Sequence, residues 1–341
     1  MIKAAIIGLG RMGVSHFAIV NAHPDANLVS ICEPNTFVAS AVGKYSGIDC
    51  HKDFKKMIDT VDLDCVFITT PTRFHFEMVH YALEAGLHVF VEKPFCLNPE
   101  DGKKLVELAA MKQVVNQVGY HNRFIGTFGE ARRLINSGAF GEVYHVLGEA
   151  YGPVVLKEKG KTWRSDTSEG GGCLYDYATH VVNLIQFMVG SPESVSGVVL
   201  KIIYSAGVDD AVYGTLHFAN GMSGQLSVNW SDETYRKMST KITVLGKKGK
   251  IIVDAQELKV YFRQEPVENR YEKGWNMLWV TDLSPAVGFY LRGEEYSAQI
   301  EYFVDCIKRR NFDNINSFAN AHATDCVVDQ LKRDAWANQV V

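Results

Sequence analysis

The sequence predicts an α/β protein of two domains, the second of which is an α+β domain built on a large, mostly antiparallel open sheet. Across the first third of the chain, short apolar runs alternate with helical patterns, which is typical of a parallel sheet covered by helices. From Ser194 to Arg263, apolar residues recur at every second position between Gly and Asn turns, which indicates antiparallel strands. The length of 341 residues also favours two domains.

The N-terminal domain is expected to span residues 1–122. Its buried strands are expected at Lys3–Gly8, Leu28–Cys32, Cys65–Thr69, His88–Val91 and Val114–Tyr120. The helices between them are expected at Met12–Ala22, Phe37–Tyr45, Phe74–Ala85 and Pro99–Met111. Pro99 at a helix start and Gly86 just past a helix end agree with capping preferences.

The second domain is expected to span residues 123–341. A helix near 128–137 and a strand at 142–150 come before a Gly-rich turn, Gly170–Gly172, which opens a helix running to about Met188. The antiparallel strands follow, with a turn at Asn220-Gly221. Two closing helices, near 296–309 and 318–336, are candidates for packing back on the N-terminal domain.

Composition excludes several classes of function. The formal net charge of -4, without a Lys/Arg stripe, argues against a nucleic-acid partner. The chain has no apolar run of about 18 residues, so no membrane span is predicted. Seven cysteines without a Cys-x-x-Cys pair, and an apolar N-terminus that ends in a glycine turn, favour free thiols in the cytoplasm and no metal site.

The strongest motif is Gly8-Leu9-Gly10-Arg11-Met12-Gly13, which follows a strand and opens a helix. In that context the first glycine allows the tight turn, the second lets the backbone approach a pyrophosphate, and the third lets helix and strand pack closely. The helix N-terminus then points at the phosphates. The motif therefore predicts a Rossmann dinucleotide-binding domain.

Glu33 lies at the end of the second predicted strand, where an acid accepts hydrogen bonds from the adenosine ribose. A carboxylate there repels a 2′-phosphate, and no Arg follows closely, so NAD is favoured over NADP. A solvated acid at a strand end is the alternative. Thr70, Pro71 and His75 follow the next strand and are expected on the nicotinamide side, although an ordinary Pro-containing helix start would look the same.

Glu92-Lys93-Pro94 directly follows the strand that ends at Val91 and completes the expected cofactor site. Together with the glycine turn and the pattern Gly171-Gly172-x-x-x-Asp176-x-x-x-His180, it resembles the Gfo/Idh/MocA family of glucose–fructose oxidoreductase and inositol 2-dehydrogenase. The resemblance covers essentially the whole chain. It implies that Lys93 is a catalytic lysine, with Asp176 and His180 as its partners on a helix of the substrate domain.

The spacing of Asp176 and His180 is compatible with that role, because residues four apart share one face of a helix. A secondary alcohol gives up hydride only as its hydroxyl proton leaves, so the reaction needs a base. We expect His180 to be the base, Lys93 to stabilise the alkoxide and Asp176 to orient the hydroxyl. The reverse assignment, with Lys93 as the proton acceptor, stays open.

One position departs from the resemblance, because many family members carry Asp three residues after the histidine and this chain has Asn183. Asn183 is therefore either a substrate contact without charge or a packing residue of the helix. Further substrate contacts are expected from aromatic and hydrogen-bonding side chains at Tyr120, Asn122, Arg123, Trp163 and Arg164, with Arg292 as another candidate for binding an anionic group.

The resemblance implies an NAD(P)-dependent dehydrogenase or reductase acting on a CH–OH group of a sugar, cyclitol or nucleotide sugar. The resemblance also implies a homodimer or homotetramer, paired through the open sheet face. Two alternatives stay open: an NAD-dependent glycosidase that oxidises and eliminates without net cofactor turnover, and a sensor that binds the cofactor without catalysis.

Overall fold

The computed structural model describes residues 1–157, 162–284 and 294–338. These residues form two compact units. Residues 1–121 and 294–322 belong to unit 1, and residues 122–157, 162–284 and 323–338 belong to unit 2. The last helix, α10 (Phe318–Asn338), begins in unit 1 and continues in unit 2.

Unit 1 is built on a six-stranded parallel sheet with the order β3-β2-β1-β4-β5-β6. Every neighbouring pair in it is parallel. The strands are β1 (Ile2–Ile7), β2 (Ala26–Cys32), β3 (Asp49–His51), β4 (Cys65–Ile68), β5 (His88–Val91) and β6 (Asn116–Val118). The order changes direction at β1, and ligands of such sheets bind at the carboxyl ends of the strands at that point.

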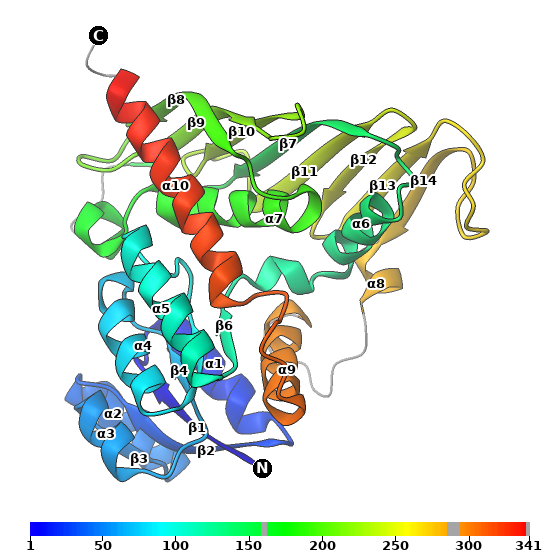
Figure 1. The fold of residues 1–341 in the computed structure, drawn as a ribbon. Helices are drawn as coiled ribbons and strands as arrows, with labels where there is room; N and C mark the ends of the chain where they lie inside the picture. The colour runs from blue at the N-terminus through cyan, green and yellow to red at the C-terminus, as the bar shows by residue number, and fades with distance from the viewer. Residues whose placement is uncertain (158–161, 285–293, 339–341) are drawn as a thin grey trace. The chain divides into compact units, whose positions relative to one another are not determined.

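Helices cover both faces of this sheet (Figure 1). Alternate residues of β1 enter two separate cores: Ala4 and Ile6 pack towards α1, α2 and α9, whereas Ala5 and Ile7 pack towards α3, α4 and α5. The helices are α1 (Arg11–Ala22), α2 (Thr36–Ser46), α3 (Phe54–Thr60), α4 (His75–Glu84), α5 (Pro99–Lys112) and α9 (Glu294–Arg309). A strand buried on both faces reads as a continuous apolar run, as β1 does.

Unit 2 contains an eight-stranded sheet with the order β14-β13-β12-β11-β7-β10-β9-β8. The pair β7–β10 is parallel and the remaining pairs are antiparallel. The strands are β7 (Val143–Tyr151), β8 (Ser194–Lys201), β9 (Ala211–His217), β10 (Ser223–Asn229), β11 (Ser239–Gly246), β12 (Gly249–Asp254), β13 (Glu257–Phe262) and β14 (Gly274–Trp279). The predicted fold class is confirmed.

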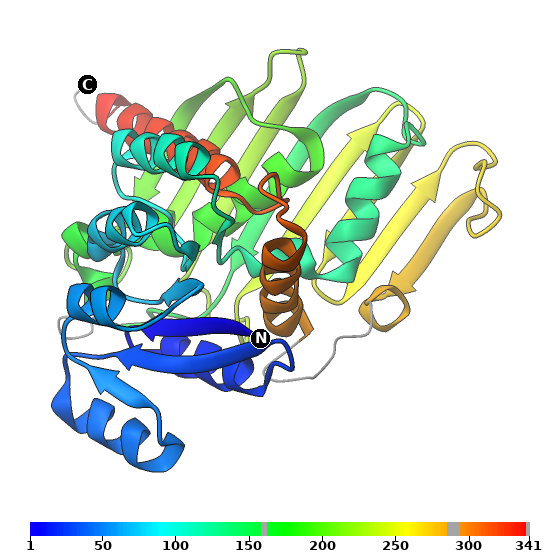
Figure 2. The ribbon, with the colours of Figure 1, turned by 60° about the horizontal axis from the view of Figure 1, so that its bottom comes forward.

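Helices α6 (Gly126–Asn136) and α7 (Thr179–Val189) pack on one face of this sheet, as the views in Figures 1 and 2 agree. Helix α7 comes so close to β7 that a Cβ atom at Gly148 would overlap Val181. The short helix α8 (Val280–Leu283) follows β14. Close helix-on-sheet packing fixes the position of the polar residues that α7 carries.

The structure adds strand β3 and helix α3 to the elements predicted for the N-terminal domain, and it differs from the predictions at further places. Strand β6 is limited to Asn116–Val118, because the residues after it turn into a 3₁₀ segment at His121–Phe124. Strand β14 lies beyond the range predicted for the sheet. The helix expected from the Gly-rich turn onwards starts with a π-helical turn at Leu174–Ala178 and becomes an α-helix at Thr179.

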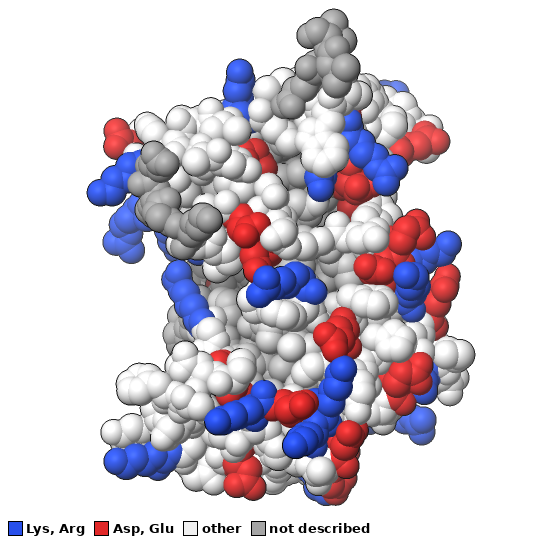
Figure 3. Space-filling model, turned by 90° about the vertical axis from the view of Figure 1, so that its left-hand side faces the viewer, with Lys and Arg blue, Asp and Glu red and all other residues white. Residues whose placement is uncertain are grey.

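Surface charge is mixed rather than segregated. On the face drawn in Figure 3, Lys and Arg side chains alternate with Asp and Glu side chains among the described residues, and no continuous basic area covers it. In the described parts of the chain, no helix combines the length and the apolar composition needed to cross a membrane.

Candidate active site

The glycine turn has the geometry that a dinucleotide needs. Gly8 has φ +92°, and a Cβ atom there would lie 2.9 Å from Cγ2 of Thr70. A Cβ atom at Gly13 would overlap the carbonyl oxygen of Gly8, so α1 and the turn pack without side chains between them. At Gly10, by contrast, nothing lies within 4 Å of a Cβ position, and the space above this backbone is open to a ligand.

The N-terminus of α1 is available to an anion. Its first turn carries no acidic residue, and the Ncap residue Gly10 makes no side-chain cap. Arg11 is exposed and Met12 is half-buried at this end of the helix. Because unsatisfied N–H groups and the helix dipole favour negative charge, the turn fits a pyrophosphate.

Glu33 connects the glycine turn to the start of α2. One oxygen of its carboxylate, Oε2, accepts a hydrogen bond from the backbone N–H of Leu9 at 2.7 Å, and Oε1 accepts one from the N–H of Asn35 at 2.9 Å. A carboxylate has about four acceptor sites, so both oxygens can still accept a ribose hydroxyl. Glu33 is half-buried. The sequence indicated the ribose contact but not the bond to Leu9.

The segment after β4 packs against the glycine turn. Oγ1 of Thr69 donates to the carbonyl oxygen of Gly8 at 2.6 Å. Thr70 is half-buried, its hydroxyl lies 3.4 Å from Sδ of Met78, and Pro71 is exposed. Thr70 and Pro71 therefore lie at the carboxyl edge of the sheet.

His75 lies in the interior of unit 1 and makes contacts to backbone. Its Nε2 is 3.0 Å from the carbonyl oxygen of Thr70, and its Nδ1 is 3.0 Å from that of Pro94 and 3.1 Å from that of Phe95. Burial lowers the pKa of His75, which disfavours the charged ring. His75 thus joins the segment after β4 to the segment after β5 through backbone carbonyls.

The residues of Glu92-Lys93-Pro94 differ in exposure. Glu92 is buried, and its Oε1 lies 2.6 Å from Nε2 of His16 on α1. Its Oε2 accepts a hydrogen bond from the backbone N–H of Lys93 at 3.3 Å. Lys93 is half-buried and Pro94 is buried. His16 is not among the residues singled out from the sequence. Its position three residues after Gly13, in the helix that the glycine motif opens, is the signal that could have indicated it.

In unit 2, Asp209 holds the start of the helix that carries Asp176 and His180. Its Oδ2 accepts the backbone N–H of Leu174 at 2.6 Å, and its carbonyl oxygen accepts that of Cys173 at 2.8 Å. Burial raises the pKa of Asp209 to about 6. Gly172 has φ +105°, and a Cβ atom there would lie 2.5 Å from Oδ1 of Asp209. The Gly-rich turn is therefore required for this contact.

Asp176 and Arg164 form an ion pair. Nε of Arg164 donates to Oδ2 of Asp176 at 3.1 Å, and the guanidinium lies 4.4 Å from the centre of the Trp163 ring. Asp176 is 7% exposed and His180 is 5% exposed, whereas Trp163 is 43% exposed. The structure thus brings together three predicted residues from two segments, Trp163 and Arg164 from one and Asp176 from the other. Asp176 belongs to the π-helical turn, a feature that often occurs at functional sites.

Asn183 and Arg123 bind each other inside unit 2. Nε of Arg123 donates to Oδ1 of Asn183 at 2.6 Å, and Nη2 donates to the Asn183 carbonyl oxygen at 3.2 Å. Nδ2 of Asn183 donates to Oγ1 of Thr324 at 2.9 Å, and that hydroxyl donates to Oε1 of Gln186 at 2.6 Å. Asn183 is 1% exposed and Arg123 is 5% exposed. Both residues therefore anchor α7.

The remaining predicted substrate residues in the described part of the chain, Tyr120 and Asn122, are both buried. Tyr120 is buried in unit 1, where its carbonyl oxygen accepts a bond from Asn316 at 3.2 Å. Asn122 is buried in unit 2, and its Nδ2 makes no hydrogen bond to the described residues. Arg292 lies outside the described residues.

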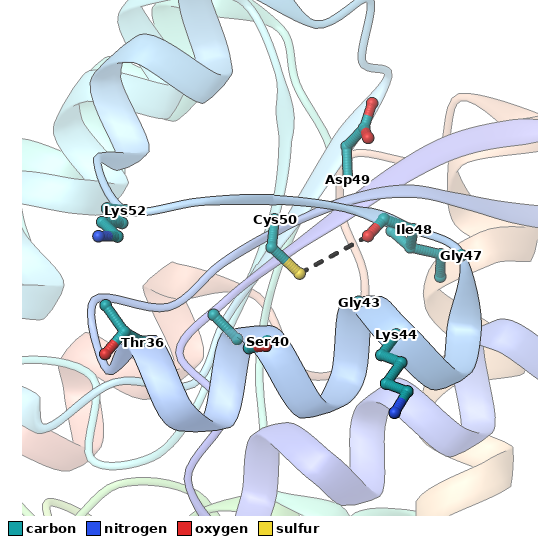
Figure 4. Close-up of a pocket in the computed structure, with 10 residues that line it drawn as sticks. Thr36, Ser40, Gly43, Lys44, Gly47, Ile48, Asp49, Cys50 and Lys52 are labelled. Atoms are coloured by element: carbon teal, nitrogen blue, oxygen red, sulfur yellow. Dashed lines mark hydrogen bonds between the residues drawn. The ribbon is translucent and has the colours of Figure 1, made fainter.

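A cavity of about 620 Å³ lies between α2 and β3 of unit 1 (Figure 4). Thr36, Ser40 and Cys50 line it, and Lys44 and Lys52 lie at it with exposed side chains. The Cys50 thiol lies 3.6 Å from the carbonyl oxygen of Ile48, as Figure 4 shows. This cavity shares no residue with the predicted cofactor site.

Comparison with known proteins identifies both halves of the chain. Residues 2–120 match the family described as "Oxidoreductase family, NAD-binding Rossmann fold", and residues 128–252 match the "GFO/IDH/MocA C-terminal domain". The expectation of NAD as cofactor is confirmed by this match.

Two curated relatives are similar over much of the chain. A scyllo-inositol 2-dehydrogenase (NAD(+)) of Bacillus subtilis is 25% identical over 314 residues, which cover 90% of this chain and 86% of the relative. A D-glucoside 3-dehydrogenase of Escherichia coli is 29% identical over 240 residues, or 64% of this chain and 68% of the relative. Among solved structures, a levoglucosan dehydrogenase in complex with NADH and levoglucosan shares the fold, with a TM-score of 0.87, 24% identity and coverage of 98% of this chain and 97% of that one.

Replacing Glu33 tests whether its carboxylate both holds the glycine turn at Leu9 and accepts the ribose hydroxyls of the cofactor. We expect Glu33→Ala to weaken NADH binding about 10-fold or more, because bonds to a charged group contribute about 1.5–3 kcal/mol each and the glycine turn loses its anchor at Leu9. Binding of NADPH should strengthen relative to NADH, because the charge that repels a 2′-phosphate is gone. Titration of nicotinamide fluorescence measures both dissociation constants.

The matched control is Asp53→Asn, since Asp53 accepts the backbone N–H groups of Lys55 and Lys56 at the start of α3 and is exposed. We expect it to leave both dissociation constants unchanged. Wild-type protein that binds NADPH more tightly than NADH would contradict the assignment of Glu33.

Two substitutions at Asn183 separate an anchoring role from a substrate contact. We expect Asn183→Leu to lower the free energy of unfolding by about 2–3 kcal/mol, because Nε of the buried Arg123 guanidinium loses its side-chain acceptor. Asn183→Asp keeps an acceptor for the guanidinium but loses the donor to Thr324, so stability should fall less than in Asn183→Leu and the KM for substrate should stay near wild type. Urea unfolding and steady-state kinetics measure these values. A large change of KM in Asn183→Asp with unchanged stability would show a substrate contact instead.

Proposed function

The chain belongs to the Gfo/Idh/MocA family of NAD-binding oxidoreductases, and we propose that it transfers hydride between a CH–OH group of a sugar or cyclitol and the nicotinamide of NAD. The observation that carries the proposal is the buried pair Asp176 and His180 on one stretch of helix, with Arg164 bonded to the carboxylate. A buried Asp is rare unless it is paired, and burying a polar group is costly unless it is hydrogen-bonded.

We propose that the glycine turn, Glu33, Thr70 and Pro71 hold the dinucleotide. The open space above Gly10, the free N-terminus of α1 and the remaining acceptor sites of Glu33 support this assignment. When bound, NAD supplies the hydride acceptor. His75 and Glu92 contact neighbouring protein groups, so we propose that they hold the loops of the cofactor site in place and do not bind the cofactor directly.

The proton must leave the substrate hydroxyl as hydride leaves its carbon. We propose that His180 accepts this proton and that the ammonium of Lys93 stabilises the alkoxide. Asp176 orients the hydroxyl, and its bond to Arg164 keeps the carboxylate in a fixed position. The opposite assignment gives the proton to Lys93, and the variants below distinguish the two.

The substrate class follows from the side chains near Asp176. The half-exposed Trp163 ring offers an apolar face for stacking on a sugar ring, and the Arg164 guanidinium beside it can bind hydroxyl or anionic groups. Two relatives are named as dehydrogenases of a cyclitol and of a D-glucoside. We propose a polyhydroxylated ring as the substrate, as a free sugar, a cyclitol or the sugar of a nucleotide conjugate.

Site variants test the mechanism. We expect Lys93→Met and His180→Asn each to lower kcat about 100-fold or more, because one removes electrostatic stabilisation and the other removes the base. Absorbance of the reduced nicotinamide, followed with scyllo-inositol, levoglucosan and a methyl glucoside, measures turnover. If His180 is the base, its variant also loses the decline of kcat at acid pH, whereas Lys93→Met keeps it.

Lys104→Met and His80→Asn are matched controls, because both side chains are exposed on helices of unit 1. We expect wild-type rates for both. Wild-type turnover in Lys93→Met and His180→Asn together would refute the mechanism. Release of a sugar from a glycoside without net formation of NADH would instead support the glycosidase alternative. A protein that binds NADH but converts none of the substrates would support the sensor alternative.

We also propose that the chain forms a homodimer or homotetramer through the uncovered face of the unit 2 sheet. The edge strand β14 presents Trp275, Met277 and Trp279 at 59%, 52% and 51% exposure, and Trp275 lies 5.3 Å from the Tyr261 ring on β13. Exposed apolar stripes of this kind mark interfaces. Sedimentation velocity should show that Trp275→Asp with Met277→Asp shifts the protein to a smaller species, and an unchanged species would contradict the proposal.

We propose the cytoplasm as the place of action. The seven cysteines form no disulfide in the described part of the chain, and Cys32 and Cys65 are buried. Such thiols stay reduced in the cytoplasm.

A further inference from the structure

The buried side chains of His16 and Glu92 contact each other next to Lys93, and neither takes part in the proton or hydride transfer proposed above. His16 comes from α1, the helix that the glycine turn opens, and Glu92 comes directly before Lys93. Nε2 of His16 lies 2.6 Å from Oε1 of Glu92. The two residues are 76 positions apart in the sequence, so the contact joins the phosphate-binding helix to the loop of the lysine.

His16 is enclosed by the centre of unit 1. The residue is 0% exposed, and its ring lies 5.1 Å from the Phe90 ring on β5 and 6.4 Å from the Phe67 ring on β4. Its Nδ1 is buried without a hydrogen bond to the described residues. Packing on two central strands leaves the imidazole little freedom, so Nε2 is directed at Glu92.

Glu92 is held on both oxygens. Oε1 contacts His16, and Oε2 accepts the backbone N–H of Lys93 at 3.3 Å. Gly119 lies against the carboxylate, and a Cβ atom there would lie 3.0 Å from Oε1. The carboxylate therefore connects a rigid ring on one side to the backbone of Lys93 on the other.

From these contacts we propose that His16 is a positioning residue that acts through the Glu92 carboxylate to fix the backbone of Lys93. The inference rests on the proposed function of Lys93, because positioning matters only if that side chain acts on the substrate. Helix α1 would then both bind the phosphates at its N-terminus and, through His16, hold the backbone of Lys93 in place. Loss of His16 then affects Lys93 more than it affects binding of the dinucleotide.

Electrostatics agree with this geometry. Burial raises the pKa of Glu92, but the hydrogen bond and attraction of His16, with smaller contributions from Lys93 and His121, outweigh burial and leave this pKa below its usual value. His75 is a further titratable neighbour, because the charge of Glu92 raises its pKa against the lowering by burial. Glu92 therefore stays ionised at neutral pH, as an acceptor for two partners requires.

The sign of the pH dependence follows. Because the pKa of Glu92 is lowered in the folded protein, its contribution to stability is complete above the unfolded value of 4.5 and is lost as the pH falls through the folded value. Without His16, burial dominates and the pKa of Glu92 rises. The carboxylate then takes up a proton at a higher pH than in the wild type.

The chain offers a matched control at the other end of the same helix. His23 is 3% exposed, and its Nε2 lies 3.3 Å from Oε2 of Glu301. His23→Leu removes a buried histidine and a carboxylate contact at the opposite end of α1 from the glycine turn. His16→Leu removes the contact next to Lys93, and His16→Gln restores a neutral donor to Glu92.

Three readouts on the full chain test the proposal. Infrared spectra across a pH series detect the protonated carboxyl of Glu92, assigned with Glu92→Gln. After reductive methylation with ¹³C-formaldehyde, NMR detects the dimethylated Lys93, assigned with Lys93→Arg. Steady-state kinetics with scyllo-inositol or levoglucosan give kcat, and fluorescence titration gives the dissociation constant of NADH.

We expect His16→Leu to protonate Glu92 at higher pH, to shift and broaden the Lys93 resonance and to lower kcat about 10–100-fold, while NADH binding changes by no more than about 3-fold. His16→Gln should recover most of the resonance and of kcat. His23→Leu should lower only the thermal stability.

A Lys93 resonance in His16→Leu that matches the one in His23→Leu would overturn the proposal, and so would a loss of kcat that His16→Gln does not recover. The infrared and NMR readouts need no substrate. If the proposed function failed and no sugar were oxidised, a displaced Lys93 resonance would still establish the positioning contact, and an unchanged one would still refute it.

Discussion

The glycine turn of unit 1 packs directly against the neighbouring strand end, and the rest of the cofactor side depends on this packing. Gly13 lies against the Gly8 carbonyl oxygen, which also accepts the hydroxyl of Thr69. With no side chain between turn and helix, α1 has one possible position on the sheet. That position directs the helix N-terminus to the phosphate site and directs His16 to Glu92. The proposed phosphate site and the proposed positioning of Lys93 thus depend on the same packing contact.

Unit 2 uses buried polar contacts in a similar way. Asp209 holds the backbone at the start of the π-helical turn, and Arg123 and Asn183 hold α7 one turn beyond His180. Asp176 and His180 lie between these two anchors. Burying such groups is costly unless each one is bonded, so the surrounding bonds stabilise one arrangement of the helix. The Asn at position 183 suits this role, because its amide donates to Thr324 while its oxygen accepts from Arg123.

Much of the fold could be predicted from the sequence because its periodicities are strong. Strand β1 is buried on both faces and therefore reads as an apolar run, and β11 to β13 alternate between buried and half-buried residues. Strands of three residues, such as β3, are too short for a period to show. The π-helical turn has no sequence pattern of its own, because its residues, Leu174–Ala178, are compatible with an α-helix.

The sequence by itself determined the dinucleotide turn, the acid at Glu33 and the order of the polar motifs, since each of these depends on local backbone geometry and short spacing. Only the tertiary structure decided which polar residues bind each other. Arg164 was expected at the substrate and is bonded to Asp176, Arg123 is bonded to Asn183, and His16 is paired with Glu92. These partners are 12, 60 and 76 residues apart. Contacts over such separations are set by how helices pack on sheets, which no local pattern records.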